Sequence, residues 1–287
     1  MTQGNTVVDE AFSHFYTLIS PLRCHSCATR ARICQMCPKL KSIKNAPIGS
    51  IHIVGSVMRK TDLRDLSDVD VMVEFFPGAF DITEVDSREM IGEVKSALQD
   101  VPGVQSVRDK GEVVGVEYPD GSQIEIQPVI PATPTGYALP DGAGGWIATD
   151  PFCQEKFLNT QAKVSPVDLR SLIRGLKYWN FHQGKLLSSY HIEVIASRLA
   201  GNFSRTFASA NLEFFRLAQG NLNQSDPADH RKVLGQSIPE LQLRTIIQVL
   251  AEAEEQSRSA VHAEKSGSAE LAIAKWHALF GHPFPTG

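Results

Sequence analysis

The sequence lacks any apolar run long enough to cross a membrane, and its N-terminus lacks the basic start and apolar core of a secretion signal. It also has no internal repeat and no low-complexity tract. The 287 residues are 42% hydrophobic and 21% charged, with a mean hydropathy of -0.14, so wholesale disorder and fibrous repeats are excluded. We therefore expect a folded cytoplasmic protein of one large domain or two closely packed ones, with no membrane contact.

Acidic residues are absent between Ala11 and Thr61, although the whole chain has a net charge of -4. That stretch holds eight basic residues, which are Arg23, Arg30, Arg32, Lys39, Lys41, Lys44, Arg59 and Lys60. The net charge argues against a protein coated for long nucleic acid, so the basic stretch indicates either a local anion site or a solvated helix face balanced by acidic neighbours. It either lines a triphosphate cleft or binds a nucleic-acid activator, and we favour the cleft.

Four of the five cysteines lie close together, at Cys24, Cys27, Cys34 and Cys37. Their two Cys-x-x-Cys pairs resemble zinc knuckles, but the six-residue interval between the pairs is shorter than in usual zinc ribbons. On one unbroken helix the four would lie along one face, where buried thiols act as small hydrophobic groups. Buried thiols are therefore our first interpretation, and a zinc site is the second, with His25 as a spare ligand.

The hydrophobic pattern changes near residues 155–165. Before this point it predicts a mixture of strands and helices: strands 51–54, 69–76, 112–118 and 123–130, and helices 9–22, 22–37 and 86–99. Pro38 is expected to end or kink the second helix. Beyond it the pattern predicts helices only, over 169–181, 189–199, 204–219, 240–265 and 269–280. We therefore expect an α+β fold, with a mixed α/β lobe over 1–160 that includes the N-terminal helix and an all-helical lobe over 161–287.

The chemistry concentrates between Gly55 and Asp70. A Gly55-Ser56 turn follows an apolar strand and offers backbone N–H groups and a hydroxyl to a phosphate. Asp68 and Asp70 lie two residues apart on the next strand, so their carboxylates share one face. Carboxylates that close repel each other unless a cation separates them, and Mg²⁺ takes such oxygen ligands while bridging to phosphates. Glu125 on a later strand would complete a two-metal site.

These residues carry a resemblance. The Gly55-Ser56 turn, the Asp68-Val-Asp70 pair and a later strand acid resemble the nucleotidyltransferase superfamily of DNA polymerase β. The segments LKYW (176–179) and SSYHIE (188–193) are similar to the helical lobe of the oligoadenylate synthases and cyclic GMP-AMP synthase. The ending KWHALFGHPFP (275–285) is similar to that of the bacterial CD-NTases of anti-phage (CBASS) signalling operons. The resemblance covers residues 50–285.

The resemblance implies a polymerase-β-like nucleotidyltransferase lobe with a mixed sheet, followed by an all-helical lobe, with the active site in the cleft between them. It implies that Gly55 and Ser56 hold the triphosphate of the donor nucleotide. It further implies that Asp68 and Asp70 bind two Mg²⁺ or Mn²⁺ ions, and that Glu125 binds the catalytic one. For the helical lobe, the resemblance implies that Lys177 and Ser189 contact the β- and γ-phosphates and that Tyr190 stacks on a base. Without the resemblance, Lys177 and Tyr190 would be interpreted as an ordinary helix surface and an ordinary core aromatic.

The implied reaction is attack of a ribose hydroxyl on the α-phosphorus of a nucleoside triphosphate, with release of pyrophosphate. Repeated within one pocket, it would close a cyclic di- or trinucleotide second messenger. The implied partners are nucleoside triphosphates (ATP, GTP or pyrimidine nucleotides), an effector that receives the cyclic product, and an activating protein or nucleic acid. We expect a monomer, since no heptad pattern or exposed apolar stripe demands another subunit.

Two alternatives stay open. One is transfer of a nucleotide to another acceptor, such as RNA, a protein or a small molecule. The other follows from Glu125, because CD-NTases usually carry Asp at this position and Glu is one methylene longer. A displaced carboxylate would leave a catalytically weak protein that acts as a nucleotide-binding sensor.

Overall fold

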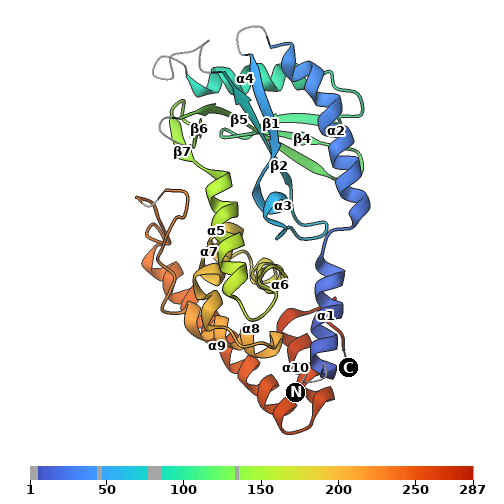
Figure 1. Ribbon diagram of the computed structural model, residues 1–287, viewed down its shortest axis with the longest axis vertical. Helices are drawn as coiled ribbons and strands as arrows, with labels where there is room; N and C mark the ends of the chain where they lie inside the picture. Colours follow the sequence, from blue (N-terminus) through green and yellow to red (C-terminus); the bar gives the residue numbers. More distant parts are fainter. Residues whose placement is uncertain (1–5, 44–46, 77–85, 133–135, 230, 287) are drawn as a thin grey trace. The chain divides into compact units, whose positions relative to one another are not determined.

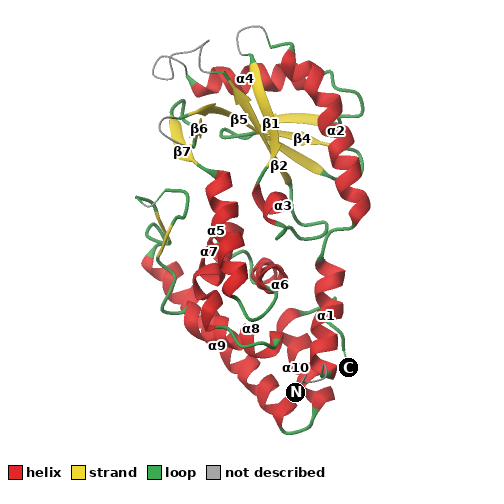
Figure 2. Cartoon of the chain, viewed as in Figure 1, coloured by secondary structure: helices red, strands yellow, loops and turns green. Residues whose placement is uncertain are grey.

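The computed structural model divides the chain into two compact units, which Figures 1 and 2 display as a strand-rich and a helical part. The sheet unit comprises residues 21–155, and the helical unit comprises residues 1–20 and 156–287. The change of unit lies close to the predicted boundary at residue 160. The described residues are 6–43, 47–76, 86–132, 136–229 and 231–286, with side chains described for all of these except residues 23–26.

The sheet unit is built on a seven-stranded mixed sheet in the order β1-β2-β5-β4-β3, to which β6 and β7 are added beyond β5. Strands β2 and β5 are parallel neighbours, and the other pairs are antiparallel. The strands are β1 (Ile48–Ile53), β2 (Val69–Phe75), β3 (Ser106–Asp109), β4 (Val114–Glu117), β5 (Gln123–Pro131), β6 (Tyr137–Pro140) and β7 (Trp146–Thr149). The helices are α2 (Arg23–Lys41), α3 (Gly55–Arg59) and α4 (Ser87–Leu98).

One face of this sheet is apolar and is covered by α2 and α4 (Figure 1). Val71 and Val73 of β2 and Ile126 of β5 are fully buried there. They pack against the helix residues Met36, Leu40, Met90, Ile91, Val94 and Leu98. Since side chains alternate along a strand, the intervening residues of β2 and β5 point to the opposite face. That opposite face carries the candidate carboxylates.

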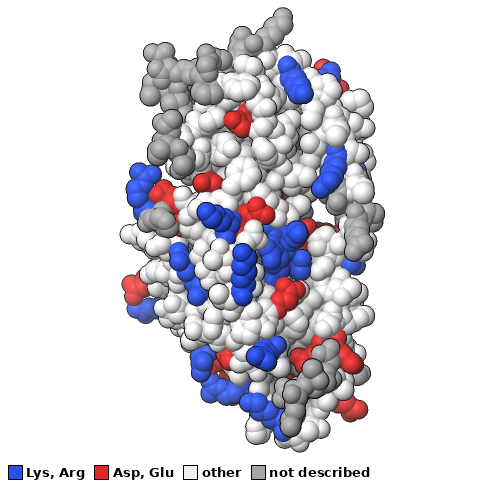
Figure 3. Space-filling view, in the orientation of Figure 1, with Lys and Arg blue, Asp and Glu red and all other residues white. Residues whose placement is uncertain are grey.

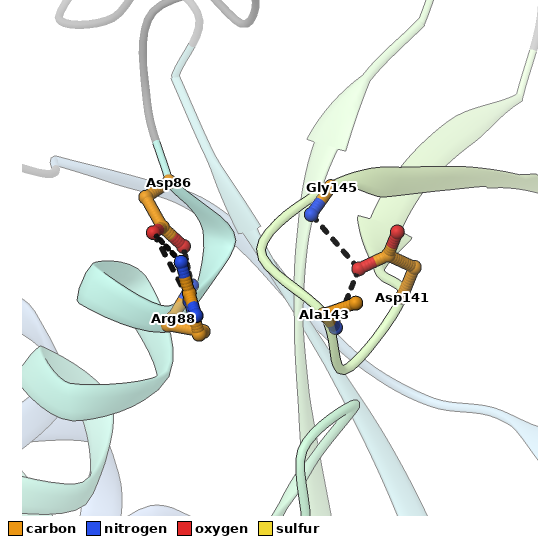
Figure 4. Close-up of polar contacts among 5 residues, drawn as sticks. All are labelled: Asp86, Arg88, Asp141, Ala143 and Gly145. Atoms are coloured by element: carbon orange, nitrogen blue, oxygen red, sulfur yellow. Dashed lines mark hydrogen bonds and ion pairs between the residues drawn. The ribbon is translucent and has the colours of Figure 1, made fainter.

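The turn between β6 and β7 is fastened to the first turn of α4 by a backbone hydrogen bond, and Figure 4 shows the hydrogen bonds within each of these two segments. Asp141 accepts hydrogen bonds from the backbone N–H groups of Ala143 and Gly145, at 2.7 and 2.8 Å. Asp86 caps α4 and binds the Arg88 guanidinium, which holds the pKa of the Asp86 carboxyl below its usual value. The backbone N–H of Ser87 donates to the carbonyl of residue 144 at 3.1 Å, so the turn and the helix start form one assembly.

The helical unit buries α1 (Val7–Ile19) in an aromatic core. Phe12 packs edge-to-face on Trp276 and Phe284, with ring centroids 5.1 and 5.0 Å apart. The sequence had placed this N-terminal helix with the mixed lobe, whereas its rings belong to the helical core. The other helices are α5 (Pro151–Val164), which begins in the sheet unit, α6 (Leu169–His182), α7 (Ser189–Leu199), α8 (Phe207–Ala218), α9 (Glu240–Lys265) and α10 (Ala269–Phe280).

The described helices α7, α9 and α10 begin and end at the predicted residues. Other predictions need correction. Helix α2 continues through Pro38 to Lys41, because a proline in the last turn removes only one helical hydrogen bond. The second half is not all-helical, since β8 (Gln224–Ser225) pairs with β9 (Val233–Leu234). Within the described part of the chain, every helix is too short or too polar to span a bilayer.

Candidate active site

Gly55 places the backbone directly against a candidate ligand. Its φ of +64° is in the left-handed region, and a Cβ built on it would lie 1.8 Å from Oδ2 of Asp70. The neighbouring backbone is fixed as well, because the N–H of Val54 donates to the carbonyl of Asp70 at 2.9 Å. Only glycine combines this conformation with this contact. The half-buried Ser56 follows in the short helix α3, so the Gly-Ser turn and the first strand acid form one packed unit.

Replacing Gly55 by alanine is therefore expected to push the Asp70 carboxylate away and to strain the backbone. We expect the free energy of unfolding to fall by about 1–3 kcal/mol and nucleotidyl transfer to slow about tenfold or more. Urea denaturation and a single-turnover assay would measure the two effects. Gly103→Ala is the matched control, because Gly103 also has a positive φ, of +79°, but an added Cβ there meets nothing within 4 Å. Equal losses in both variants would contradict the specific contact with Asp70.

Of the three predicted acids, Asp70 and Glu125 lie on adjacent strands, whereas Asp68 precedes its predicted strand. Asp68 is exposed just before β2, and Asp70 and Glu125 are half-buried. Asp70 is the direct register partner of Glu125 in the parallel β2–β5 pair, so their side chains lie next to each other on one face. Gln127, two residues further along β5, has its Nε2 3.5 Å from Oδ1 of Asp70. The predicted alternation of core and polar residues on both strands is confirmed.

A lysine that sequence reasoning missed lies among these acids. Nζ of Lys110, in the turn between β3 and β4, is 2.7 Å from Oε1 of Glu125. The hydrogen bond to Glu125 raises the pKa of Lys110 above its usual value, partial burial opposes this rise, and the negative charges of Glu125, Asp68 and Glu117 add to it. The ammonium group of Lys110 is therefore protonated and positively charged at neutral pH. No local sequence signal indicates the contact, because it depends on the register of the hairpin.

The donor set suits a hard divalent cation in its chemistry, since it consists of carboxylate oxygens presented from neighbouring strands. Among the residues that the structure describes, no three His, Cys, Asp or Glu side chains converge closely enough to hold one ion. Glu125 is instead engaged by Lys110. The residues thus suit a divalent cation in their chemistry and in the strand register of Asp70 and Glu125. The carboxylate of Glu125 is paired with the ammonium group of Lys110.

A pocket of about 910 Å³ lies in the sheet unit beside Asp68. It is lined by α2, by the loop over residues 60–69 and by the β4–β5 turn, and its basic lining residues are Arg30, Arg32, Lys60 and Arg64. Arg30, Arg32 and Lys60 of the basic stretch therefore border this pocket. That the stretch lines a triphosphate cleft stays a prediction. Arg59 does not, because it is buried and donates to Oε1 of Gln154 at 3.1 Å. On the face that Figure 3 presents, basic and acidic side chains are interspersed.

Arg32 is already engaged at the rim of this pocket. Its guanidinium lies 2.7 Å from Oδ2 of Asp120 and 4.0 Å from the ring centre of Tyr118. The hydrogen bond from Arg32 holds the pKa of the Asp120 carboxyl well below its usual range. Arg32 thus fastens α2 to the β4–β5 turn and shapes the pocket wall.

The helical unit contains the other three predicted nucleotide contacts. Ser189 is exposed at the first turn of α7, and the half-buried Tyr190 donates its hydroxyl to Oδ1 of Asp226 at 2.8 Å. Lys177 is buried, with 2% of its side chain exposed, and its Nζ is 3.1 Å from Oε1 of Glu193. Sequence reasoning missed Glu193 as its partner, although Glu193 ends the SSYHIE segment. The phosphate and base contacts of these residues stay predictions.

The cysteine cluster differs from the first interpretation. Cys27 and Cys34 are exposed on α2 and Cys37 is half-buried, so the described thiols are not packed as core residues. Burial, together with the nearby Cys34, raises the pKa of the Cys37 thiol. The side chains of Cys24 and His25 lie outside the described residues. Zinc binding by the four cysteines stays a prediction.

Comparisons with known proteins identify the family of this chain. The profile of the Second Messenger Oligonucleotide or Dinucleotide Synthetase (SMODS) domain matches residues 7–161. A probable cyclic nucleotide synthase of Bacillus cereus strain VD146 is 25% identical over 273 residues, covering 81% of each chain.

Solved structures of two bacterial proteins share the fold. CdnC of E. coli MS115-1, solved with ATP, aligns with a TM-score of 0.77 at 17% identity, over 96% of this chain and 98% of that chain. The same protein has been solved in a complex with a HORMA protein. CdnG of Bradyrhizobium diazoefficiens, solved with GTP, aligns with a TM-score of 0.76 at 13% identity, over the same shares.

The structural matches confirm the predicted polymerase-β-like nucleotidyltransferase fold, a mixed sheet combined with a helical region. The SMODS profile covers more than half of the chain, and its limits are close to the predicted lobe over 1–160. The protein therefore belongs to the SMODS family of CD-NTases and is a nucleotidyltransferase.

Proposed function

We propose that the protein joins nucleoside triphosphates into a cyclic di- or trinucleotide second messenger and releases pyrophosphate. The observation that carries the proposal is the packing of Gly55 against Asp70, with Asp70 in register with Glu125. This arrangement brings a phosphate-accessible backbone turn next to two acids of neighbouring strands. The relatives support it, because one is named a cyclic nucleotide synthase and others have been solved with ATP or GTP.

In this proposal the chain's own residues position the reacting groups. The Gly55-Ser56 turn binds the donor triphosphate through backbone N–H groups and the Ser56 hydroxyl. Asp68, Asp70 and Glu125 would hold two divalent cations, Mg²⁺ or Mn²⁺. Such ions lower the pKa of the attacking ribose hydroxyl and stabilise the leaving pyrophosphate. The contacts of Asp70 with Gly55 and Gln127 keep its carboxylate aimed while the α-phosphorus is attacked.

The pocket beside Asp68 supplies room for a nucleotide. Its volume of about 910 Å³ is in the range of small-molecule sites, and its lining combines basic with acidic side chains. We propose that Arg30, Lys60 and Arg64 bind phosphates there. In the helical unit, Ser189 presents a hydroxyl at a helix N-terminus, and Tyr190 presents a ring held by Asp226. We propose that these two contact the phosphates and a base, respectively.

A product assay tests the proposal. The wild-type protein, incubated with all four nucleoside triphosphates and Mg²⁺ or Mn²⁺, is expected to form a phosphatase-resistant cyclic product that mass spectrometry identifies. Adding excess EDTA should abolish the product, and restoring the metal should recover it. The outcome against the proposal is labelling that requires added RNA, protein or a small molecule. That result would favour transfer to another acceptor, the alternative that the sequence left open.

The proposal extends to an activator, an effector and the cellular compartment. CdnC forms a complex with a HORMA protein, which supports testing such a protein as an activator of this chain. A cyclic product also requires an effector that receives it, in keeping with a role in CBASS anti-phage signalling. Because nucleoside triphosphates are the substrates, we place the reaction in the cytoplasm.

A further inference from the structure

One cation in the candidate active site has no part in the proposed reaction. Nζ of Lys110 is 2.7 Å from Oε1 of Glu125 and 3.5 Å from Oε1 of Gln123. Both oxygens belong to β5, on the face that Asp70 shares. The side chain of Lys110 is 36% exposed and that of Glu125 is 21% exposed, so the pair is partly screened from water.

The hairpin is shaped to accommodate this lysine. Gly115 of β4 is the direct register partner of Glu125, and a Cβ on it would lie 2.7 Å from Cε of Lys110. The stem of the lysine therefore occupies the space that a side chain at 115 would fill. The turn itself is fixed, because the backbone N–H of Lys110 donates to the carbonyl of Val113 at 3.0 Å. The Glu125 contact is thus built into the fold.

The two cations of the β3–β4 hairpin, Lys110 and Arg108, pair with different acids. Lys110 forms an ion pair with Glu125, which lies on the sheet face that Asp70 shares. Glu117 has a second cation of its own, since its Oε2 is 3.1 Å from the Arg108 guanidinium. Lys110 therefore pairs with an acid of the candidate site, whereas Arg108 pairs with Glu117, which is not one of the candidate acids.

We propose that Lys110 is an internal counter-ion that holds Glu125 until metal and nucleotide bind, when a divalent cation replaces its ammonium group on the carboxylate. The inference rests on the proposed function. It also accounts for a glutamate as the third acid, because an aspartate is one methylene shorter and would draw its carboxylate back from Lys110. Lys110 is in this sense a positioning residue, which acts through Glu125.

Direct metal binding tests the proposal without relying on turnover. Mn²⁺ binding to the full chain would be measured by electron paramagnetic resonance, in the presence of the non-reactive analogue α,β-methylene-ATP. Removing the competing ammonium in Lys110→Met is expected to tighten the weaker Mn²⁺ site about fivefold. Lys110→Arg, which keeps the charge, should stay within about twofold of wild type. Arg108→Met is the matched control, because it removes a neighbouring positive charge that does not contact Glu125.

The outcomes separate this inference from the function on which it rests. Tighter Mn²⁺ binding in Lys110→Met, but not in Arg108→Met, supports the counter-ion. In a Glu125→Gln background, Lys110→Met should have no further effect on Mn²⁺ binding. Equal tightening in Arg108→Met, or unchanged binding in Lys110→Met while wild type binds Mn²⁺ and forms product, overturns the counter-ion only. Absence of Mn²⁺ binding in wild type and Lys110→Met overturns both the counter-ion and the two-metal function.

Discussion

Asp70→Asn is expected to slow nucleotidyl transfer by about 10³-fold or more while leaving the fold intact. Asparagine has the shape of aspartate but no negative charge, so it would hold a divalent cation poorly while fitting the same space beside Gly55. A loss of this size corresponds to about 4 kcal/mol of transition-state stabilisation, which is typical when one charged group of a preorganised site is removed. Single-turnover formation of product would measure the rate.

The control for this variant is Asp65→Asn. Asp65 lies in the loop that precedes β2, is exposed, and has a φ of +58°, a conformation that asparagine adopts readily. We expect its activity to stay within about twofold of wild type, since no metal-binding role is assigned to it. If Asp70→Asn kept a tenth of the wild-type rate, Asp70 would not be a ligand of the reacting metals. Loss of the unfolding transition in Asp70→Asn would instead assign the carboxylate a structural role.

Lys177→Met is expected to lower the free energy of unfolding by about 3–5 kcal/mol. The side chains of Lys177 and Glu193 are only 2% and 4% exposed, so the substitution removes a positive charge that lies 3.1 Å from a buried carboxylate. The double variant Lys177→Met/Glu193→Leu removes both charges and should recover most of that loss. Urea denaturation of the three proteins would complete the cycle, with Arg244→Met, which breaks an exposed pair, as the control.

The same double variant tests whether Lys177 also contacts phosphates. Once stability is restored, a remaining loss of activity with a raised KM for the nucleotide would assign Lys177 to the substrate. A folded double variant with wild-type kinetics would show that the lysine only stabilises the helical unit. A single variant as stable as wild type would contradict the cost assigned to removing the buried ammonium group.

Local sequence signals predicted the described helices of ten or more residues except α5 (Pro151–Val164). Helix α7 begins at the predicted residue because Ser188 caps it, accepting a hydrogen bond from the N–H of His191 at 3.2 Å. Strands β3, β6 and β7 were not predicted, since each is defined by its pairing with neighbours in the sheet. Alternation along β2 and β5 placed Asp70 and Glu125 on one face, because a period of two needs no tertiary information.

The contacts that sequence reasoning missed depend on tertiary structure. Helix α6 is buried on several sides, with Leu176, Lys177, Tyr178 and Trp179 all within the interior, so a one-sided apolar stripe could not identify Lys177 as buried. Lys110 meets Glu125 only because the β3–β4 hairpin and β5 pair in one particular register. Likewise, the exposure of Cys27 and Cys34 depends on which face of α2 packs on the sheet.

Because β2 and β5 are parallel, changes in the acids and changes in the group that opposes them fall in different segments of the chain. Parallel neighbours cannot be joined by a tight turn, so the chain must cross over between Phe75 and Gln123. That connection contains α4 and the β3–β4 hairpin, and therefore Lys110. The two paired acids belong to the strands, whereas the group that opposes them belongs to the connection. Exchanging the crossover between homologous chains would therefore alter the charge facing Glu125 while the acids keep their register, which makes it a natural unit for engineering the metal preference of this fold.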